Sequence, residues 1–292
     1  MDTAGDVAML WLFYAVSFVF AAACLYPFVL MLTSSFTDEA TLIREGYKLL
    51  PKKWSLNAYK SVLSSQTVPD AYFVTTVVTV AGTILSLIIT GMCSYAISGK
   101  TLKYREIIAF IFYFTMLFSG GLVPTYILIS RYLRMRNSLL VYILPSLVNP
   151  WNMLLLRNFF NGIPESFRES ATIDGANELT IFIRIMIPLS TPAIATFALF
   201  YGLGYWGMWM ESMLYIDAGN ERLYMLQYLV MKIMRSVTSS RAIAQQGIPL
   251  PLLPAETIRY ATALLTIGPI IMLYPFLQRY FVTGIRVGGI KG

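Results

Sequence analysis

The chain has 292 residues, of which 57% are hydrophobic and only 13% are charged, with a net charge of +7. Soluble domains usually carry about 25% charged residues, so this composition favours a membrane protein. Histidine is absent, which removes the commonest general base and metal ligand. The two cysteines, Cys24 and Cys93, lie in apolar runs and form neither a zinc pattern nor a disulfide framework. The basic residues are scattered and show no nucleic-acid motif, so we expect no nucleic-acid partner and no metal site.

Long apolar segments predict six transmembrane helices, because a spanning helix needs about 20 mostly apolar residues. The expected fold class is all-α, with a single transmembrane domain over residues 1–292. The first apolar run continues past Ala21-Ala22-Ala23, so we expect a retained helix and not a cleaved signal peptide. The six predicted spans cover residues 7–32, 71–97, 107–130, 139–156, 185–210 and 260–278.

Three polar loops separate these spans, at residues 33–69, 157–184 and 211–256, and a tail follows from residue 279. Residues 56–63 of the first loop predict a short interfacial helix. Six spans place both termini on the same side as loop 157–184. That side carries 9 Lys and Arg residues and the opposite side carries the other 13 of 22. The positive-inside rule therefore argues mildly against cytoplasmic termini, and sidedness must rest on other features.

Two features inside the spans concern packing. The third span is interrupted by Ser119-Gly120-Gly121. A broken helix is tolerated at membrane depth only where it packs in protein or lines a cavity, so Gly120 and Gly121 are either pathway residues or a plain packing kink. The second span contains small residues that would let neighbouring helices approach closely, namely Gly82, Ser86, Gly91 and Ser94.

The loop around Glu169 predicts a helix, a glycine turn and a second helix. Residues 163–173 can form a short amphipathic helix with Pro164 in its first turn. Gly175 lies where that helix must end, a position that often requires a positive φ. By helical spacing Phe167, Ser170 and Ala171 would share one face suited to a partner's groove. The alternative is an ordinary surface loop with a glycine turn.

The same loop resembles the cytoplasmic coupling loop of bacterial ABC importer permeases. The family pattern is Glu-Ala-Ala, three residues, Gly, nine residues, Ile, one residue, Leu-Pro. Glu169, Ala171, Gly175, Ile185 and Pro188 match this pattern at the right spacing, whereas Ser170 and Ile187 replace Ala and Leu. Asp174 and Ala176 match the Asp-Gly-Ala variant usual in sugar permeases.

The likeness extends over nearly the whole chain. Val123-Pro124-Thr125-Tyr126, Leu144-Pro145, and the segment from Tyr274-Pro275-Phe276 to the final Lys291-Gly292 are similar to the smaller permease subunit of maltose-type importers. The similarity is greatest to the branch that serves oligosaccharides and polysaccharides, including alginate. It implies the type I ABC importer permease fold and a location in the bacterial inner membrane with both termini cytoplasmic.

The resemblance also implies partners and a division of labour. A second permease subunit would complete the pore, two ATPase subunits would bind below with ATP-Mg, and a solute-binding protein would deliver a saccharide. This chain would be no enzyme and would hold no cofactor of its own. The residues implied in ATPase coupling are Arg168, Glu169, Ser170, Ala171, Asp174, Gly175 and Ala176, with Arg286 and Lys291 as further contacts of the C-terminal tail.

The resemblance places further candidates on the other side and in the spans. In loop 211–256, Arg241, Gln245 and Gln246 would face the binding protein and its cargo, with a solvated loop as the alternative. Tyr205, Trp206 and Trp209 could stack on sugar rings, with Asn149 and Asn152 as hydrogen-bond donors. Aromatic residues in spans more often serve packing, which is the alternative here.

Other transporter and enzyme classes fit the sequence less well. An ion-coupled secondary transporter of a small polar solute is the main alternative, but such carriers usually place ionisable residues at mid-span, and these spans have none there. An intramembrane enzyme would need a nucleophile and base or a carboxylate pair within the spans, and none is visible. No Gly-x-x-x-x-Gly-Lys-Ser/Thr phosphate loop occurs, so ATP hydrolysis would need a separate chain.

Overall fold

The computed structural model describes residues 4–64, 67–245 and 255–288, without the side chains at 4, 8, 237–245, 255 and 273–288. The described part is helical and contains no β-strand, only one isolated bridge between Thr37 and Trp54. Its first helices are α1 (Ala4–Ser35), α2 (Glu39–Glu45), α3 (Asn57–Leu63), α4 (Thr67–Ser98), α5 (Arg105–Leu117), α6 (Leu122–Ile127) and α7 (Leu140–Ile143). The later ones are α8 (Pro150–Asn161), α9 (Ser166–Ile173), α10 (Glu178–Ile181), α11 (Ile187–Leu189), α12 (Thr191–Trp206), α13 (Met210–Tyr215), α14 (Leu226–Gln245) and α15 (Ala255–Gly288). The helix α3 confirms the short helix expected in the first polar loop.

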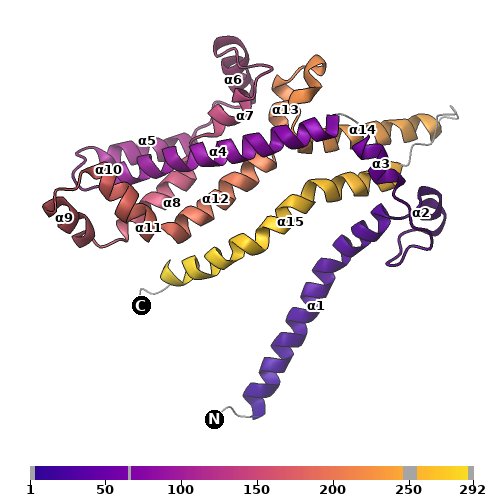
Figure 1. The fold of residues 1–292 in the computed structure, drawn as a ribbon, viewed down its shortest axis with the longest axis horizontal. Coiled ribbons are helices and arrows are strands. Elements are labelled where there is room, and N and C mark those ends of the chain that lie inside the picture. The colour runs from indigo at the N-terminus through magenta and orange to yellow at the C-terminus, as the bar shows by residue number, and fades with distance from the viewer. Residues whose placement is uncertain (1–3, 65–66, 246–254, 289–292) are drawn as a thin grey trace. The chain divides into compact units, whose positions relative to one another are not determined.

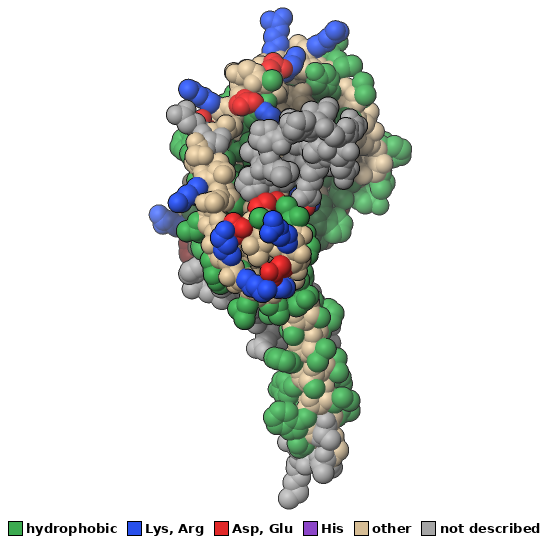
Figure 2. All heavy atoms as spheres, turned by 90° about the vertical axis from the view of Figure 1, so that its right-hand side faces the viewer, with side chains coloured by type: hydrophobic (Ala, Val, Ile, Leu, Met, Phe, Trp, Pro, Cys, Tyr) green, Lys and Arg blue, Asp and Glu red, His purple; other side chains and the backbone are tan. Residues whose placement is uncertain are grey.

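The chain divides into two compact units, one of residues 1–68 and 230–268 and the other of residues 69–229 and 269–292. In the first unit, α1 is apolar along its length, and none of its most apolar window is buried by the described chain. Figure 2 shows hydrophobic side chains over this helix. In the segment that follows α2, Lys48 and Lys52 pair with Glu45. An apolar helix with no protein cover needs lipid or another subunit around it.

A carboxylate also holds the first unit together at the start of α15. The two Glu39 oxygens accept the backbone N–H groups of Glu256 and Thr257, each at 2.9 Å. The Thr257 hydroxyl donates to the same carboxylate at 2.7 Å. The first N–H groups of a helix have no partner within it, so a negative side chain there satisfies them and complements the helix dipole.

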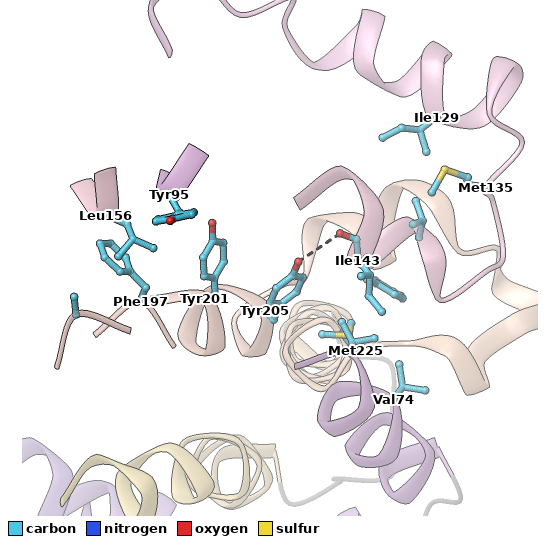
Figure 3. Close-up of a cluster of buried hydrophobic side chains, with 14 of the residues drawn as sticks. Val74, Tyr95, Ile129, Met135, Ile143, Leu156, Phe197, Tyr201, Tyr205 and Met225 are labelled. Carbon is cyan, nitrogen blue, oxygen red and sulfur yellow. Dashed lines mark hydrogen bonds between the residues drawn. The ribbon is translucent and has the colours of Figure 1, made fainter. Parts of the chain in front are cut away.

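The core of the second unit lies between α4, α8 and α12. Figure 3 shows Tyr201 and Tyr205 of α12 in this buried cluster, together with Leu156 of α8 and Val74 of α4. Figure 1 shows α4, α5, α8 and α12 in the same bundle, and α8 packs on both α5 and α12.

Hydroxyl groups join α4 to its neighbours at successive turns. The Ser86 hydroxyl lies 2.9 Å from that of Tyr205, and the Thr90 hydroxyl lies 2.6 Å from that of Tyr201. The Ser94 hydroxyl donates to the Met153 carbonyl at 2.8 Å. Because these groups are buried, each hydrogen bond satisfies atoms that water does not reach. The expectation that small residues of this span serve close helix packing is confirmed.

By length and composition, two described helices can cross a membrane, Gly5–Ser35 and Thr67–Ser98. Two bent pairs qualify only when taken together. Arg105–Leu117 and Leu122–Tyr132 meet at 108°, and Glu178–Leu189 and Thr191–Trp206 meet at 85°. The described part therefore supplies two to four spans, and the count of six stays a prediction.

The third, fourth and fifth predicted spans are not continuous helices. The third breaks between α5 and α6, where the expected glycine interruption lies and Gly121 has φ +85°. In residues 139–156, α7 is followed by a 3-10 turn and then by α8, whose N-cap is Asn149. In residues 185–210, a π-helical turn and α11 precede α12, which ends at Trp206. Prolines at 145, 150, 188 and 192 explain the last two cases, because each lacks a backbone N–H and favours the start of a helical turn.

Two segments expected to be irregular are largely helical. Residues 211–256 contain the 20-residue helix α14, and α15 continues to Gly288 where a tail was expected from residue 279. In α14 the buried residues Leu226, Leu229 and Val230 recur at helical spacing. That amphipathic pattern is the signal for a helix, and its modest overall hydrophobicity hid it in a search for spans.

An asparagine and an aspartate tie the segment before α7 to the end of α13. Asn137, at φ +55°, donates its side-chain amide to Asp217 at 2.7 Å, and its side-chain oxygen accepts the Asp217 backbone N–H at 2.8 Å. Arg136 forms an ion pair with the same carboxylate. The hydrogen bond from Asn137 and the charge of Arg136 hold the pKa of Asp217 below its usual range.

We expect Gly82→Ala to destabilise the second unit. A Cβ at Gly82 would lie 2.6 Å from the ring of Tyr205, which is fixed by the hydrogen bond to Ser86. Overpacking of this kind costs about 1–3 kcal/mol, which should lower the melting temperature in detergent. The matched control is Gly204→Ala on α12, where no atom lies within 4 Å of the added Cβ. An equal response of both variants would contradict the close α4–α12 contact.

Candidate functional site

The segment around Glu169 forms a helix, a glycine turn and a second helix. Helix α9 begins at Ser166, three residues later than expected, and Pro164 lies in the turn before it. At its end Gly175 has φ +81°, which confirms the predicted need for a positive φ. The Ala176 N–H donates to the Ala171 carbonyl across this turn at 2.9 Å. The Asn177 side chain then caps α10 by accepting the Thr180 N–H at 2.8 Å.

Helix α9 presents most of its side chains to the outside. Glu169 and Ser170 are exposed, and the side chains of Phe167 and Ile173 are 48% and 86% exposed. Ala171 is buried in the core of the unit. The expected face of Phe167, Ser170 and Ala171 is therefore wrong in its last member, because Ala171 packs inward. The outward surface combines a carboxylate with two apolar side chains.

An ion pair holds the inner side of α9. The Arg168 guanidinium donates to both oxygens of Glu178 at 2.8 Å and lies 5.1 Å from the centre of the Tyr95 ring. The Tyr95 hydroxyl donates to the same carboxylate. These three side chains come from α9, α10 and α4, so the site is assembled from segments distant in the sequence. Beside them lies a cavity of about 420 Å³ whose walls include Met92 and Phe182.

The end of α4 receives further contacts from this region. Arg157 of α8 donates to the Ile97 carbonyl at 3.1 Å and pairs with Glu106 at 2.6 Å. Lys100 forms an ion pair with Glu165, directly before α9. The last carbonyls of a helix lack partners within it, so cations are favourable at this end.

Comparison with known proteins assigns the family. No protein-family model matches the chain. The chain is 34% identical to the polygalacturonan/rhamnogalacturonan transport system permease protein YtcP of Bacillus subtilis over 282 residues, 96% of this chain and 97% of the relative. It is 35% identical to the protein LplC of the same organism over 93% of this chain and 90% of the relative. The chain belongs to the ABC sugar transport permeases.

A solved structure agrees with this family. It is a crystal structure of a bacterial ABC transporter involved in the import of the acidic polysaccharide alginate. Its matching chain has 30% identity and a TM-score of 0.82, with coverage of 96% of this permease and 99% of that chain. The predicted likeness to sugar and polysaccharide permeases is thereby confirmed.

The predicted pathway residues of the permease lie in packed positions as well as exposed ones. Tyr205 is 1% exposed and Trp206 is also buried, whereas Trp209 is half-buried. Asn149 is exposed, and its side chain accepts the backbone N–H of the buried Asn152 at 3.1 Å. Gly120 and Gly121 lie exposed in the break between α5 and α6. Stacking of Tyr205 on a sugar would require its ring to be uncovered, so this role stays a prediction.

The residues predicted to contact the binding protein and, through the C-terminal tail, the ATPases lie partly outside the residues that the structure describes. Arg241 and Gln245 belong to helix α14 and Arg286 to α15, but their side chains are not described. Gln246 and Lys291 lie outside the described residues. Their assigned roles therefore stay predictions.

Sequence reasoning missed the residues that hold α9 in place. Glu178, Tyr95 and Arg157 were not singled out from the sequence. Glu178 and Tyr95 contact Arg168 of α9, and Arg157 contacts the end of α4. Glu178 had one usable signal, since it follows Arg168 by ten residues across a glycine turn between two short helices. Tyr95 lies more than 70 residues before Arg168, and no local pattern links them.

We expect Gly175→Ala to loosen the turn between α9 and α10. An L-residue in the left-handed region costs about 1–2 kcal/mol, although the space around Gly175 is open. The measurement is amide hydrogen exchange over residues 166–181. Gly175→Asn serves as the control, because asparagine tolerates this backbone conformation better. Equal protection in the parent and the Ala variant would contradict a required positive φ.

Proposed function

We propose that this permease is one translocation subunit of an ABC importer for an oligosaccharide or polysaccharide. In this proposal a second, different permease chain completes the pore, and two ATPase chains bind ATP-Mg below it. A solute-binding protein delivers the cargo from outside. This chain itself carries no catalytic site and acts by moving its helices. The observation that carries the proposal is the exposed face of α9, on a chain similar to sugar transport permeases over 96% of its length.

The exposed face of α9 has the properties of a docking surface. Phe167 and Ile173 would enter an apolar groove of the ATPase, and Glu169 would pair with a basic group at its edge. Removing two large apolar side chains from water favours association, and a carboxylate at the rim adds orientation. Ser170, Asp174 and Ala176 complete the contact, and Gly175 shapes the turn. Movement of the ATPases would then displace α9 and switch the permease between inward and outward states.

Sidedness follows from this docking. The ATPases bind ATP in the cytoplasm, so α9 and both termini would lie on the cytoplasmic side of the inner membrane. With six spans, residues 33–69 and 211–256 would then face outward. Arg241, Gln245 and Gln246 would meet the binding protein there, while Arg286 and Lys291 would reach the ATPases.

The cargo we infer is an acidic saccharide. The relative YtcP is named for polygalacturonan, and the solved neighbour imports the acidic polysaccharide alginate. The proposed outer face carries 13 basic and 8 acidic residues. A surplus of positive charge attracts anions and raises their local concentration. Tyr205, Trp206, Trp209, Asn149, Asn152, Gly120 and Gly121 are the proposed pathway residues.

We expect Glu169→Ala to abolish most ATP-dependent uptake while the permease still inserts in the membrane. The substitution removes the charge at the docking surface and leaves the buried side of α9 intact. Uptake of labelled saccharide into proteoliposomes and co-purification of the ATPase measure the two steps. Ser166→Ala, an exposed change on the same helix, is the control. Unchanged uptake by Glu169→Ala would rule out this coupling contact.

We expect uronic-acid oligomers to be taken up faster than neutral oligomers of equal length. The physical reason is attraction by the basic outer face, so the preference should shrink as salt rises. The measurement is initial uptake by the complete complex at low and high ionic strength. Equal rates for both oligomers at low salt would remove the inference of an acidic cargo.

A further inference from the structure

The inner side of α9 contacts the end of α4 at Gly99, where the two segments approach closely. A Cβ added at Gly99 would lie 2.8 Å from one Arg168 guanidinium nitrogen and 3.1 Å from another. The guanidinium therefore lies directly against the backbone at the C-terminus of α4. It is held there by both oxygens of Glu178 and by the Tyr95 ring. Arg168 is thus fixed from three sides, and its side chain is only 18% exposed.

Tyr95 is in turn fixed by its own packing. Its ring meets Phe182 at 5.1 Å and Phe160 at 6.2 Å between ring centres, and its hydroxyl donates to Glu178. A second contact is the Lys100–Glu165 ion pair, which joins the residues just after α4 to those just before α9. Helix α9 is consequently attached to the end of α4 at two places, while its opposite side is exposed.

Helix α4 continues from this attachment into the core. Between one and three turns before Tyr95, Thr90 and then Ser86 share hydrogen bonds with tyrosines of α12. A displacement of α9 that moves the end of α4 would therefore also move α12. Packed helices transmit such displacements because their contacts do not deform continuously.

We propose that Arg168, Glu178, Tyr95 and Gly99 form a rigid joint that makes α9 and α4 move as one body. Arg168 is a positioning residue here, since it faces away from the docking surface. One guanidinium nitrogen contacts both Glu178 oxygens, while the flat group also lies against Gly99 and near the Tyr95 ring. A lysine would not reproduce this set of contacts, because its ammonium is a compact point charge with no planar face. This inference rests on the proposed function, in which the ATPases displace α9.

The joint predicts a separation of ATP hydrolysis from uptake. In the complete complex with binding protein, Arg168→Lys and Tyr95→Phe should keep stimulated ATP hydrolysis, because the docking face is unchanged. Uptake per ATP should fall at least about fivefold, as expected for loss of one coupling interaction. Tyr95→Phe removes a single hydroxyl and preserves the packed ring, so it remains informative if Arg168→Lys folds poorly. The control is Arg184→Lys, an exposed arginine just after α10.

A distance measurement tests the rigid body directly. Spin labels at Ser166 on α9 and Ile88 on α4, both exposed, would be placed in the complex after Cys24→Ala and Cys93→Ala. Their mean distance should be the same with and without ATP in the parent, and its distribution should broaden in Arg168→Lys. A different mean distance in the two parent states would overturn the joint.

The outcomes also separate the joint from the docking proposal. If Glu169→Ala abolishes uptake but Arg168→Lys and Tyr95→Phe transport normally, the joint alone is wrong. Equal loss of ATP hydrolysis and uptake in the joint variants would overturn it as well, since that result indicates failed docking. Normal uptake by Glu169→Ala would instead reject the docking surface itself.

Discussion

Helix α4 passes so close to α12 that the Tyr205 ring occupies the space where a side chain at position 82 would begin. The arrangement of the second unit depends on this approach. It brings the hydroxyls of Ser86 and Thr90 within hydrogen-bond distance of two tyrosines, at separations of 2.9 and 2.6 Å. In a membrane the hydrophobic effect does little to press helices together, so close packing and such polar contacts must do so.

The broken helices follow from the same need to satisfy polar groups. Where prolines remove backbone donors, the chain bends and finds other partners. Asn149 accepts a backbone N–H at the start of α8, and the Tyr201 hydroxyl accepts the Asn149 N–H at 3.4 Å. Helix α1, in contrast, leaves its apolar side chains exposed. They form a surface for lipid or a neighbouring subunit, which agrees with a permease that works as part of an assembly.

The two sides of helix α9 carry different kinds of side chain. Its outer side carries a carboxylate between apolar residues, suited to a partner, and its inner side carries the arginine that ties it to α4. A docking segment that moved freely would absorb displacement without passing it on. A segment held against a helix end by an ion pair and an aromatic ring can transmit it, because the rigid guanidinium is in contact with both. In the proposed function, recognition of the ATPase and attachment to α4 would therefore use different faces of one short helix.

Composition and local pattern alone determined the membrane class, the helical fold, the glycine turn at position 175 and the family motif around Glu169. These are local properties: apolar length, backbone freedom and residue spacing express them directly. Only the tertiary structure decided that Ala171 packs inward and that Arg168 meets Tyr95 and Glu178. Such contacts join segments far apart in the chain, and their geometry depends on how whole helices pack. The spacing of residues within one segment does not show how that segment packs against distant ones.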